Sequence, residues 1–231
     1  MCWNALRHHN PSATARSFGV RVMLTAWLCL VSPPLSAEER TRADERDDTA
    51  LIDSLAKALA VDDAPFDRFE AEVWLQTSDQ RLARYVDDAD ERLKILENIW
   101  QRSHQHDLDP DLILALMHVE SFFDRYAISR VGAQGLMQVM PFWRLEIGRP
   151  TDNLTHVDTN IRYGTAILAH YIDVSKGDLV EALGRYNGSK GKLKYPELVL
   201  SRYRKYWRST PIGELPHIAE SCRNYRLKAC R

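Results

Sequence analysis

The sequence lacks a charge excess of either sign, an internal repeat and the alternating pattern of β-strands. Its 231 residues include 31 lysines and arginines against 32 aspartates and glutamates, giving a formal net charge of −1. This balance does not resemble the basic composition that is typical of nucleic-acid-binding proteins. No apolar–polar alternation is sustained, and no Asn-Gly pair separates two apolar runs, so neither strands nor hairpins are predicted.

The amino-terminal residues lack acidic side chains and carry only Arg7, Arg16 and Arg21 as charges up to Ala37. A short apolar run, V-M-L-T-A-W-L-C-L-V, follows the arginines and is succeeded by a Pro-Pro pair, small residues and a highly charged stretch. This order predicts a secretory signal peptide over residues 1–37 and export to the periplasm. The apolar run is too short for a comfortable membrane span. An uncleaved anchor or a buried first helix is the alternative.

Cysteine is scarce, and cleavage at this point would leave only Cys222 and Cys230 of the four. Two cysteines eight positions apart in an exported chain predict one disulfide. Because the loop is small, we expect it to pin the C-terminal tail, residues 209–231, rather than to hold the fold. His104 and His106 lie close together but lack a third ligand, so neither a metal site nor a cofactor is predicted.

The remaining sequence is organised as helical segments after a charged leader. Residues 38–50 are nearly all charged or small, which predicts disorder. Apolar residues at helical spacing predict an N-terminal helical extension over residues 51–100 and a main helical domain over residues 101–208. The helices expected in the extension and at its junction with the domain cover residues 51–60, 66–74, 80–86 and 90–104.

The main domain is predicted to be built around one buried helix that starts at Asp109-Pro110-Asp111. An aspartate can cap the helix, proline suits its first position, and acids favour its positive end. Apolar residues cover most of its circumference up to Phe123, so we expect a central helix. Gly164 in a later helix indicates close packing against another helix. With further helices expected over residues 161–172, 178–187 and 195–207, the fold class is all-α.

One carboxylate, Glu120, lies among the apolar residues of the central helix. Ionising a carboxylate in such surroundings is costly unless it is paired or stays protonated. The first explanation is a buried ion pair with Arg125, Arg162 or Arg185. The second is a carboxylic acid with a raised pKa that donates and recovers a proton near neutral pH.

Four motifs around Glu120 favour the second explanation. They are E-S-F-F-D-R-Y-A-I-S, V-G-A-Q-G-L-M-Q-V-M-P, N-I-R-Y-G-T-A-I-L and A-L-G-R-Y-N-G. In this order the chain resembles the lytic transglycosylases of the soluble (Slt) type, lysozyme-like enzymes that cleave peptidoglycan. The resemblance covers residues 109–203 and implies a lysozyme-like helical domain with a glycan cleft.

The resemblance also implies roles for individual residues. Glu120 matches the single catalytic acid, and Ser121 completes the Glu-Ser motif and supports the helix turn. Gly135 is a structural residue of the glycine-containing loop, where it permits a tight turn. The residues that match substrate-binding positions are Ser129, Gln138, Met140, Tyr163, Tyr186 and Asn187. The sequence departs from the usual pattern at residues 188–191, where Gly-Ser-Lys-Gly replaces Ala-Gly-Pro-Gly, and at Arg125.

A glycosidase normally uses two carboxylates, whereas these motifs supply one. Asp124 would share a helix face with Glu120 if the helix persists, while Glu146, Asp152 and Asp158 are expected to be caps or surface groups. The resemblance implies a route without a second acid. The 2-acetamido group of N-acetylmuramic acid assists departure of the leaving sugar. The C6 hydroxyl of the same N-acetylmuramic acid then closes on C1 to give a 1,6-anhydro end.

Two other functions remain open at this point. A hydrolysing lysozyme of the same fold would use water as the nucleophile, and a glycan-binding or scaffolding module of an envelope assembly would bind without turnover. The expected partner is the peptidoglycan glycan strand, with an envelope or secretion-machinery partner left open. We expect a monomer that does not bind nucleic acid.

Overall fold

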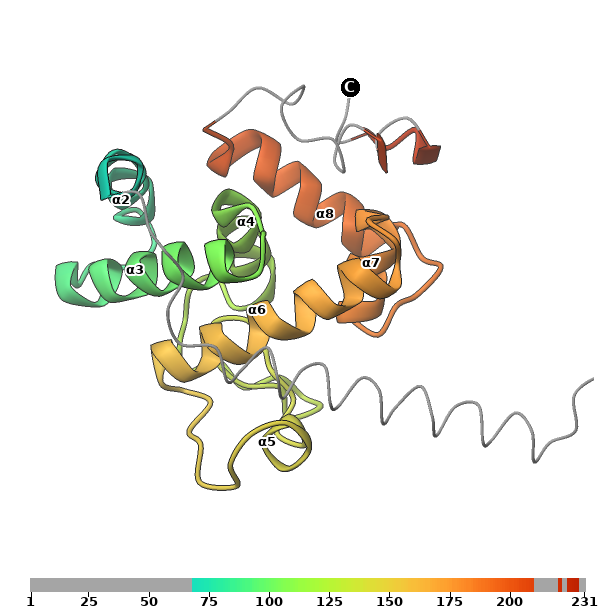
Figure 1. The fold of residues 1–231 in the computed structure, drawn as a ribbon, viewed down its shortest axis with the longest axis horizontal. Coiled ribbons are helices and arrows are strands. Elements are labelled where there is room, and N and C mark those ends of the chain that lie inside the picture. Colours follow the sequence, from blue (N-terminus) through green and yellow to red (C-terminus); the bar gives the residue numbers. More distant parts are fainter. Residues whose placement is uncertain (1–67, 210–219, 222–223, 229–231) are drawn as a thin grey trace, which may run out of the picture.

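The computed structural model describes residues 68–209, 220–221 and 224–228 (Figure 1). These residues form seven α-helices, one π-helical segment and two isolated β-bridges, and they contain no strand, so the all-α prediction is confirmed. The predicted signal peptide, leader and first helix lie outside the described residues, as do Cys222 and Cys230. The elements are α2 (Arg68–Leu82), α3 (Ala89–Gln105), α4 (Pro110–Glu120), α5 (Trp143–Glu146), α6 (Val157–Val174), α7 (Leu179–Tyr186), α8 (Lys194–Arg202) and the π-helix η1 (Tyr203–Trp207).

Helix α4 is the central element, as its apolar circumference predicts. Its start is capped by Asp109, whose side chain accepts a hydrogen bond from the Asp111 backbone N–H, and Pro110 occupies the first turn. All residues from Asp111 to His118 are buried. Helices α3 and α8 and the π-helix η1 pack around it, so both the amino-terminal and carboxy-terminal parts of the domain contact α4.

Helix α4 ends at Glu120, three residues earlier than its apolar pattern predicts. Phe122 and Phe123 adopt left-handed backbone angles, with φ of 56° and 68°, which stops the helix. Phe123 is buried, and Phe122 makes an edge-to-face contact with the ring of Tyr85, at 5.0 Å between centroids. These aromatic contacts hold a backbone that is unfavourable for bulky residues and place Glu120 at the helix terminus.

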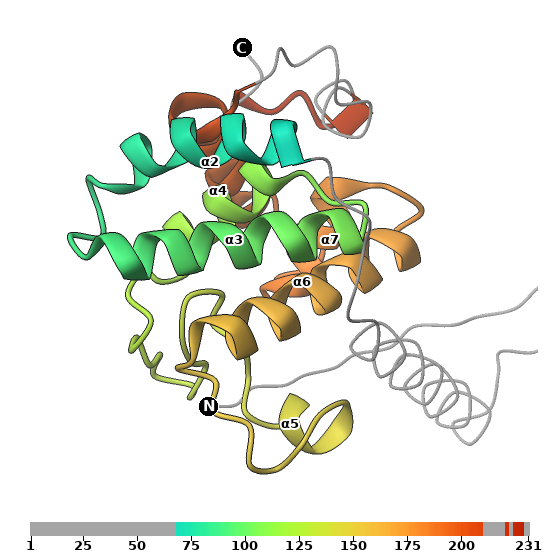
Figure 2. The same cartoon turned by 60° about the vertical axis from the view of Figure 1, so that its left-hand side comes forward.

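The predicted segments 66–74 and 80–86 are one helix in the structure, α2, which ends at Leu82. Figure 2 shows α2 and α3 side by side, with α4 and α6 packed against α3. The predicted boundary at residue 100 falls inside α3, where Ile99 and Trp100 are buried in the same core as α4. The helices before residue 100 therefore share one hydrophobic core with the domain.

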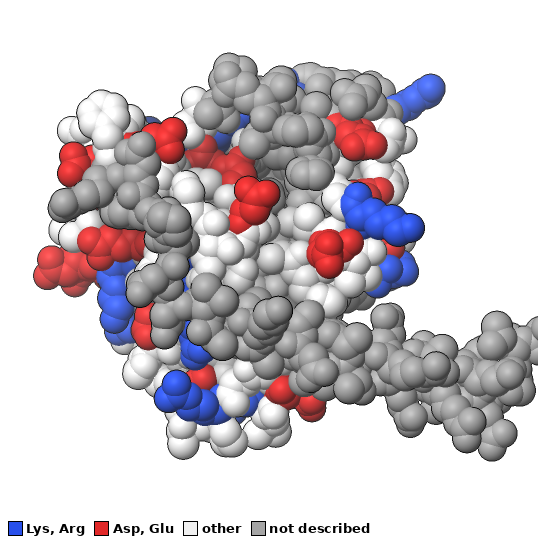
Figure 3. All heavy atoms as spheres, viewed as in Figure 1, with Lys and Arg blue, Asp and Glu red and all other residues white. Residues whose placement is uncertain are grey.

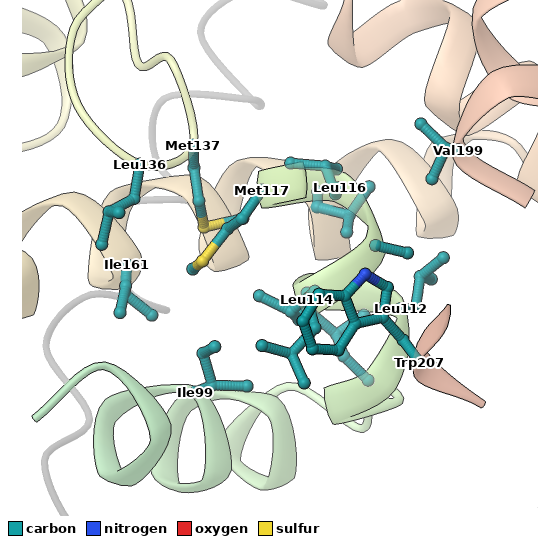
Figure 4. Packing of buried hydrophobic residues seen from close by; sticks show 14 of the residues in the cluster. Ile99, Leu112, Leu114, Leu116, Met117, Leu136, Met137, Ile161, Val199 and Trp207 are labelled. Carbon is teal, nitrogen blue, oxygen red and sulfur yellow. The ribbon is translucent and has the colours of Figure 1, made fainter. Parts of the chain in front are cut away.

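The loop between α4 and α5 packs on α6 where Met137 contacts Gly164. Met117 of α4 and Met137 of the loop point toward one another in the centre of the core, near Ile161 of α6 (Figure 4). A Cβ atom added to Gly164 would lie 2.7 Å from the Met137 Cβ atom, closer than real Cβ contacts. The close packing predicted for Gly164 is confirmed, but the expected partner was another helix and the structure places this loop there instead.

The surface carries both charge signs. On the face drawn in Figure 3, uncharged side chains predominate and acidic ones interrupt them near the centre, while basic side chains lie toward the edges. Among the described residues, no helix combines the length and hydropathy that a membrane span requires.

Gly164→Ala is expected to destabilise the protein because its methyl group must displace Met137 or move α6. Overpacking of this kind costs about 1–3 kcal/mol of unfolding free energy. Gly184→Ala in α7 is the matched control, since its added Cβ would find its nearest atom, the Lys190 Cα, at an ordinary 3.4 Å. The control should gain up to ~1 kcal/mol from helix propensity. Urea denaturation of both variants measures the difference, and equal effects would contradict the packing argument.

Candidate active site

Glu120 occupies the last position of α4, where its side chain is only partly exposed. The Tyr195 hydroxyl, from the first turn of α8, donates a short hydrogen bond to Glu120 Oε1. Burial raises the pKa of Glu120 from its ordinary value of 4.5 to about 7, and the Tyr195 hydrogen bond acts in the opposite direction. The negative end of the α4 dipole also disfavours a carboxylate at this position. Glu120 can therefore hold or release a proton close to neutral pH.

The ion pair considered for Glu120 is not formed, because each candidate arginine pairs with another acid. Arg125 lies 3.4 Å from Glu91, as measured between Nε and Oε1. The other two pairs are Arg162 with Asp152 at 3.1 Å and Arg185 with Glu181 at 2.8 Å. Among the described residues no ion pair of Glu120 is formed, so its main polar partner there is a neutral phenol.

Tyr195 was not predicted as a site residue. The sequence places it in a basic and aromatic segment, where a tyrosine ring is expected to pack in the core. In the structure the ring is 9% exposed, and burial, followed by the charge of Glu120, raises its pKa well above the ordinary value. A buried tyrosine needs a partner for its hydroxyl, but only the fold shows that the partner lies 75 positions away.

Tyr186, at the end of α7, is the second tyrosine near Glu120. Its hydroxyl donates to the backbone oxygen of Met137, with 2.8 Å between the oxygens. Its pKa is raised well above the ordinary value by burial and then by the Glu120 charge. Tyr186 thus joins α7 to the G-L-M-Q loop near the acid.

The G-L-M-Q loop is held to α4 and to itself by the predicted site residues. Ser121 Oγ donates to the Leu136 backbone oxygen at 2.7 Å, which supports the turn after the acid. Gln138 has a φ of 50°, and its Nε2 donates to the backbone oxygens of Ala127 and Gly135 at 3.1 and 3.0 Å. Both side chains order the loop that follows Glu120.

Asn160 of α6 anchors the same loop and was not predicted. Its Oδ1 accepts from the Met137 backbone N–H at 2.7 Å, and its Nδ2 donates to the backbone oxygens of Gln134 and Leu154 at 2.8 Å each. A Cβ atom on Gly135, whose φ is 76°, would lie 2.8 Å from the Asn160 Cγ. This close approach explains why a glycine is needed there.

The other predicted positions are spread around this loop. Ser129 Oγ accepts from the Ala133 backbone N–H at 3.0 Å, and Met140 is partly buried against the core. Asn187 is exposed at the C-cap of α7. Tyr163 does not join the group, because it is fully buried and its hydroxyl donates to Asp152 Oδ2 at 2.6 Å. It has no surface with which to contact a sugar.

Among the described residues, neither Asp124 nor Asp152 provides a second carboxyl group beside Glu120. Asp124 is exposed, and its Oδ1 accepts from the Tyr126 backbone N–H at 2.8 Å, because the helix ends before it could face Glu120. Asp152 is engaged by Tyr163 and Arg162.

The remaining acids considered from the sequence do not supply a second carboxyl group beside Glu120 either. Glu146 and Asp158 are exposed. Burial also raises the pKa of Asp109, which caps the opposite end of α4.

His118 and His104 are engaged by tryptophan residues of the fold. His118 is buried, accepts from Trp207 Nε1 at its Nδ1 at 3.1 Å, and has its pKa lowered by burial to about 4. His104 Nδ1 lies 2.8 Å from the Trp100 backbone oxygen. The described residues contain no group of three or more histidine, cysteine, aspartate or glutamate side chains that could hold a metal ion.

Comparison with known proteins supports the motif resemblance. Residues 97–198 match the family model described as "Transglycosylase SLT domain". The chain is 34% identical over 116 residues to proteins named "Membrane-bound lytic murein transglycosylase C" from Photorhabdus laumondii subsp. laumondii and Sodalis glossinidius, covering 43% of this chain and 32% of each relative. It is 34% identical over 99 residues to the "Transglycosylase" of Enterobacteria phage PRD1, covering 43% of this chain and 36% of that protein.

The matches are partial in both directions. The chain spans about a third of the length of the curated relatives it matches. No solved structure matches. The resemblance to Slt-type lytic transglycosylases is confirmed over the segment that contains Glu120.

Tyr195→Phe is expected to raise the pKa of Glu120 above about 7, because it removes the hydrogen bond that lowers that pKa while keeping the ring that buries the acid. Carbon-detected NMR titration of the glutamate carboxyls, assigned with Glu120→Gln, measures the change. Tyr126→Phe, at an exposed tyrosine, is the control and should leave the titration unaltered. A downward shift in Tyr195→Phe would contradict the assigned direction.

Glu120→Gln is expected to change how stability depends on pH. Below pH 4.5 the acid is protonated in both the folded and unfolded states, whereas above pH 7 the folded wild type must bury a carboxylate. Wild type therefore loses stability relative to the variant as pH rises from 4.5 to 7, by about 3 kcal/mol at most. Urea denaturation at pH 4 and pH 8 checks this, with Glu146→Gln as the exposed control. A difference that does not vary with pH would refute the buried-acid assignment.

Proposed function

We propose that this protein is a peptidoglycan lytic transglycosylase that cleaves the β-1,4 bond between N-acetylmuramic acid and N-acetylglucosamine. The observation that carries the proposal is Glu120 itself, a partly exposed acid at the end of a buried helix with a pKa of about 7. A binding module would have no need of such a proton donor. The matches to the SLT domain and to proteins named as transglycosylases support the same reaction.

In the first step, protonated Glu120 gives its proton to the glycosidic oxygen. The bond between that oxygen and C1 of N-acetylmuramic acid breaks as positive charge develops on the ring. With a pKa of about 7, a substantial fraction of Glu120 holds the required proton at neutral pH. The described residues offer no second carboxylate at Glu120, so the 2-acetamido group of the sugar stabilises the charge at C1, as the family resemblance implies.

In the second step, ionised Glu120 takes the proton from the C6 hydroxyl of the same sugar. The C6 oxygen forms a bond to C1, and the product is a 1,6-anhydro end. The proton lost in the first step is recovered, and no water is consumed. The Tyr195 hydroxyl, which donates to Glu120, stabilises the carboxylate between the two steps.

We further propose that the sugar lies against the loop after Glu120. Gln138 and Ser129 act through the loop that they order, while Met140, Tyr186 and the exposed Asn187 border the same region. Tyr163, which is fully buried, is not included. Ser189 and Lys190, where the family pattern has glycine and proline, would alter the edge of this region.

The predicted signal peptide and the wall substrate together support a location in the periplasm or at the cell envelope. The relatives named as membrane-bound are consistent with an envelope location for this chain. We propose that it acts on glycan strands there as a monomer without a cofactor.

Glu120→Gln is expected to lower turnover of purified sacculi by about 10²–10⁴-fold while keeping the fold and sacculus binding, because the amide cannot donate or recover a proton. Mass spectrometry of the released muropeptides measures both rate and product. Glu146→Gln should retain wild-type activity, since Glu146 is exposed on α5.

The same experiment distinguishes a lytic transglycosylase, a hydrolysing lysozyme and a glycan-binding module. Anhydro ends from the wild type support the proposal, and reducing ends, heavier by one water, identify a hydrolysing lysozyme. Binding without any product identifies a glycan-binding module. Full activity in Glu120→Gln would overturn the catalytic assignment.

A further inference from the structure

The described C-terminal residues, 220–221 and 224–228, lie against α7 and α8 and are here called the C-terminal strap (Figure 1). The Tyr225 hydroxyl donates to Asp178 Oδ2 at 2.6 Å. The Lys228 backbone N–H donates to Glu197 Oε1 at 2.8 Å. The strap therefore makes one hydrogen bond at the start of α7 and another on α8.

Apolar burial supports the same contact. Leu227 is 3% exposed and belongs to the main hydrophobic core, and Tyr225 packs against that core. Ser221 is also buried. Burying a leucine side chain contributes far more free energy than an exposed hydrogen bond does. Leu227 is thus the principal anchor of the strap.

The two bridged helices carry the tyrosines that surround Glu120. Asp178 is the N-cap of α7, and its Oδ1 accepts from the Val180 and Glu181 backbone N–H groups while its Oδ2 accepts from Tyr225. Helix α7 ends with Tyr186. Glu197, which receives the strap, lies two positions after Tyr195 in the first turn of α8.

The connection between α7 and α8 is held to α7 by the Ser189 N–H, which donates to the Gly184 backbone oxygen at 2.7 Å, and by Lys190, which lies 3.4 Å from Glu181. Residues 187–193 carry Gly188 and Gly191, both at positive φ, and most of their side chains are exposed. The helices have only eight and nine residues, too short to be stable without tertiary contacts. A contact that spans both helices is therefore well suited to fix their relative position.

We propose that the C-terminal strap is a positioning element of the active site, in which Leu227 and Tyr225 hold α7 and α8 so that the Tyr195 hydroxyl reaches Glu120. The strap does not touch the acid. It acts through Tyr195, and its catalytic consequence rests on the proposed function, whereas its effect on the Tyr195–Glu120 hydrogen bond does not.

A double-mutant cycle tests the proposal through activity. Leu227→Ala is expected to lower kcat roughly ten-fold or more, since small displacements of a catalytic constellation are costly, with little change in KM. In the Tyr195→Phe background the same substitution should have almost no further effect, because the hydrogen bond through which it acts is already absent. Leu93→Ala, at a leucine 47% exposed on α3, is the matched control and should leave kcat unchanged in both backgrounds.

An NMR titration tests the proposal without any assumption about the reaction. Loosening α8 weakens both the burial that raises the pKa of Glu120 and the Tyr195 hydrogen bond that lowers it, so Leu227→Ala and Tyr225→Phe should both move that pKa away from its wild-type value. Leu227→Met, which keeps an apolar side chain of similar volume, should restore the wild-type titration.

These two experiments distinguish failure of the strap proposal from failure of the proposed enzymatic function. A shifted pKa of Glu120 in Leu227→Ala, with no transglycosylase activity in the wild type, supports the positioning role of the strap and rejects the enzymatic function. An unchanged pKa of Glu120 in folded Leu227→Ala, or equal losses of kcat in the wild-type and Tyr195→Phe backgrounds, would overturn the positioning role. If Leu227→Ala does not fold, Tyr225→Phe, which removes one oxygen atom, gives the same test.

Discussion

The site depends on the burial of one carboxyl group at a helix terminus beside a neutral phenol. A carboxylate paired with arginine would stay ionised at neutral pH, and a fully exposed one would titrate far below it. Glu120 avoids both because Arg125, Arg162 and Arg185 are engaged by other acids, while Tyr195 limits the effect of burial by hydrogen bonding to it. The balance between desolvation and one hydrogen bond sets the pKa near 7, where a single acid can both give and recover a proton.

The rest of the fold serves to hold that carboxyl group in place. Left-handed angles at Phe122 and Phe123 end α4 directly after the acid, and aromatic contacts stabilise that unfavourable backbone. Asn160 uses both ends of its amide to fix the G-L-M-Q loop on α6. Tyr186 closes the loop against α7. These hydrogen bonds run mostly from side chain to backbone, so the loop is positioned by its main chain.

The sequence predicts most of the helices and the mostly apolar surroundings of Glu120, because both follow from local pattern. The start of α4 follows from Asp109-Pro110-Asp111, and an isolated acid in an apolar helix already indicates unusual chemistry. The sequence does not predict the early end of α4, since nothing in the Phe-Phe pair signals left-handed backbone. It also does not predict Tyr195 or Asn160, whose partners lie far away in the chain. Tyr163 matches a motif and yet is buried against Asp152, because a motif fixes a position in the chain and not the direction of a side chain.

Distance in the chain also explains why the carboxy-terminal residues matter for a site formed by residue 120. The acid belongs to the central helix, but its phenolic partner belongs to a nine-residue helix at the edge of the core. A hydrogen bond weakens steeply with misalignment, so the position of α8 must be controlled more closely than its own packing against α4 requires. Leu227 supplies that control by entering the core from the strap.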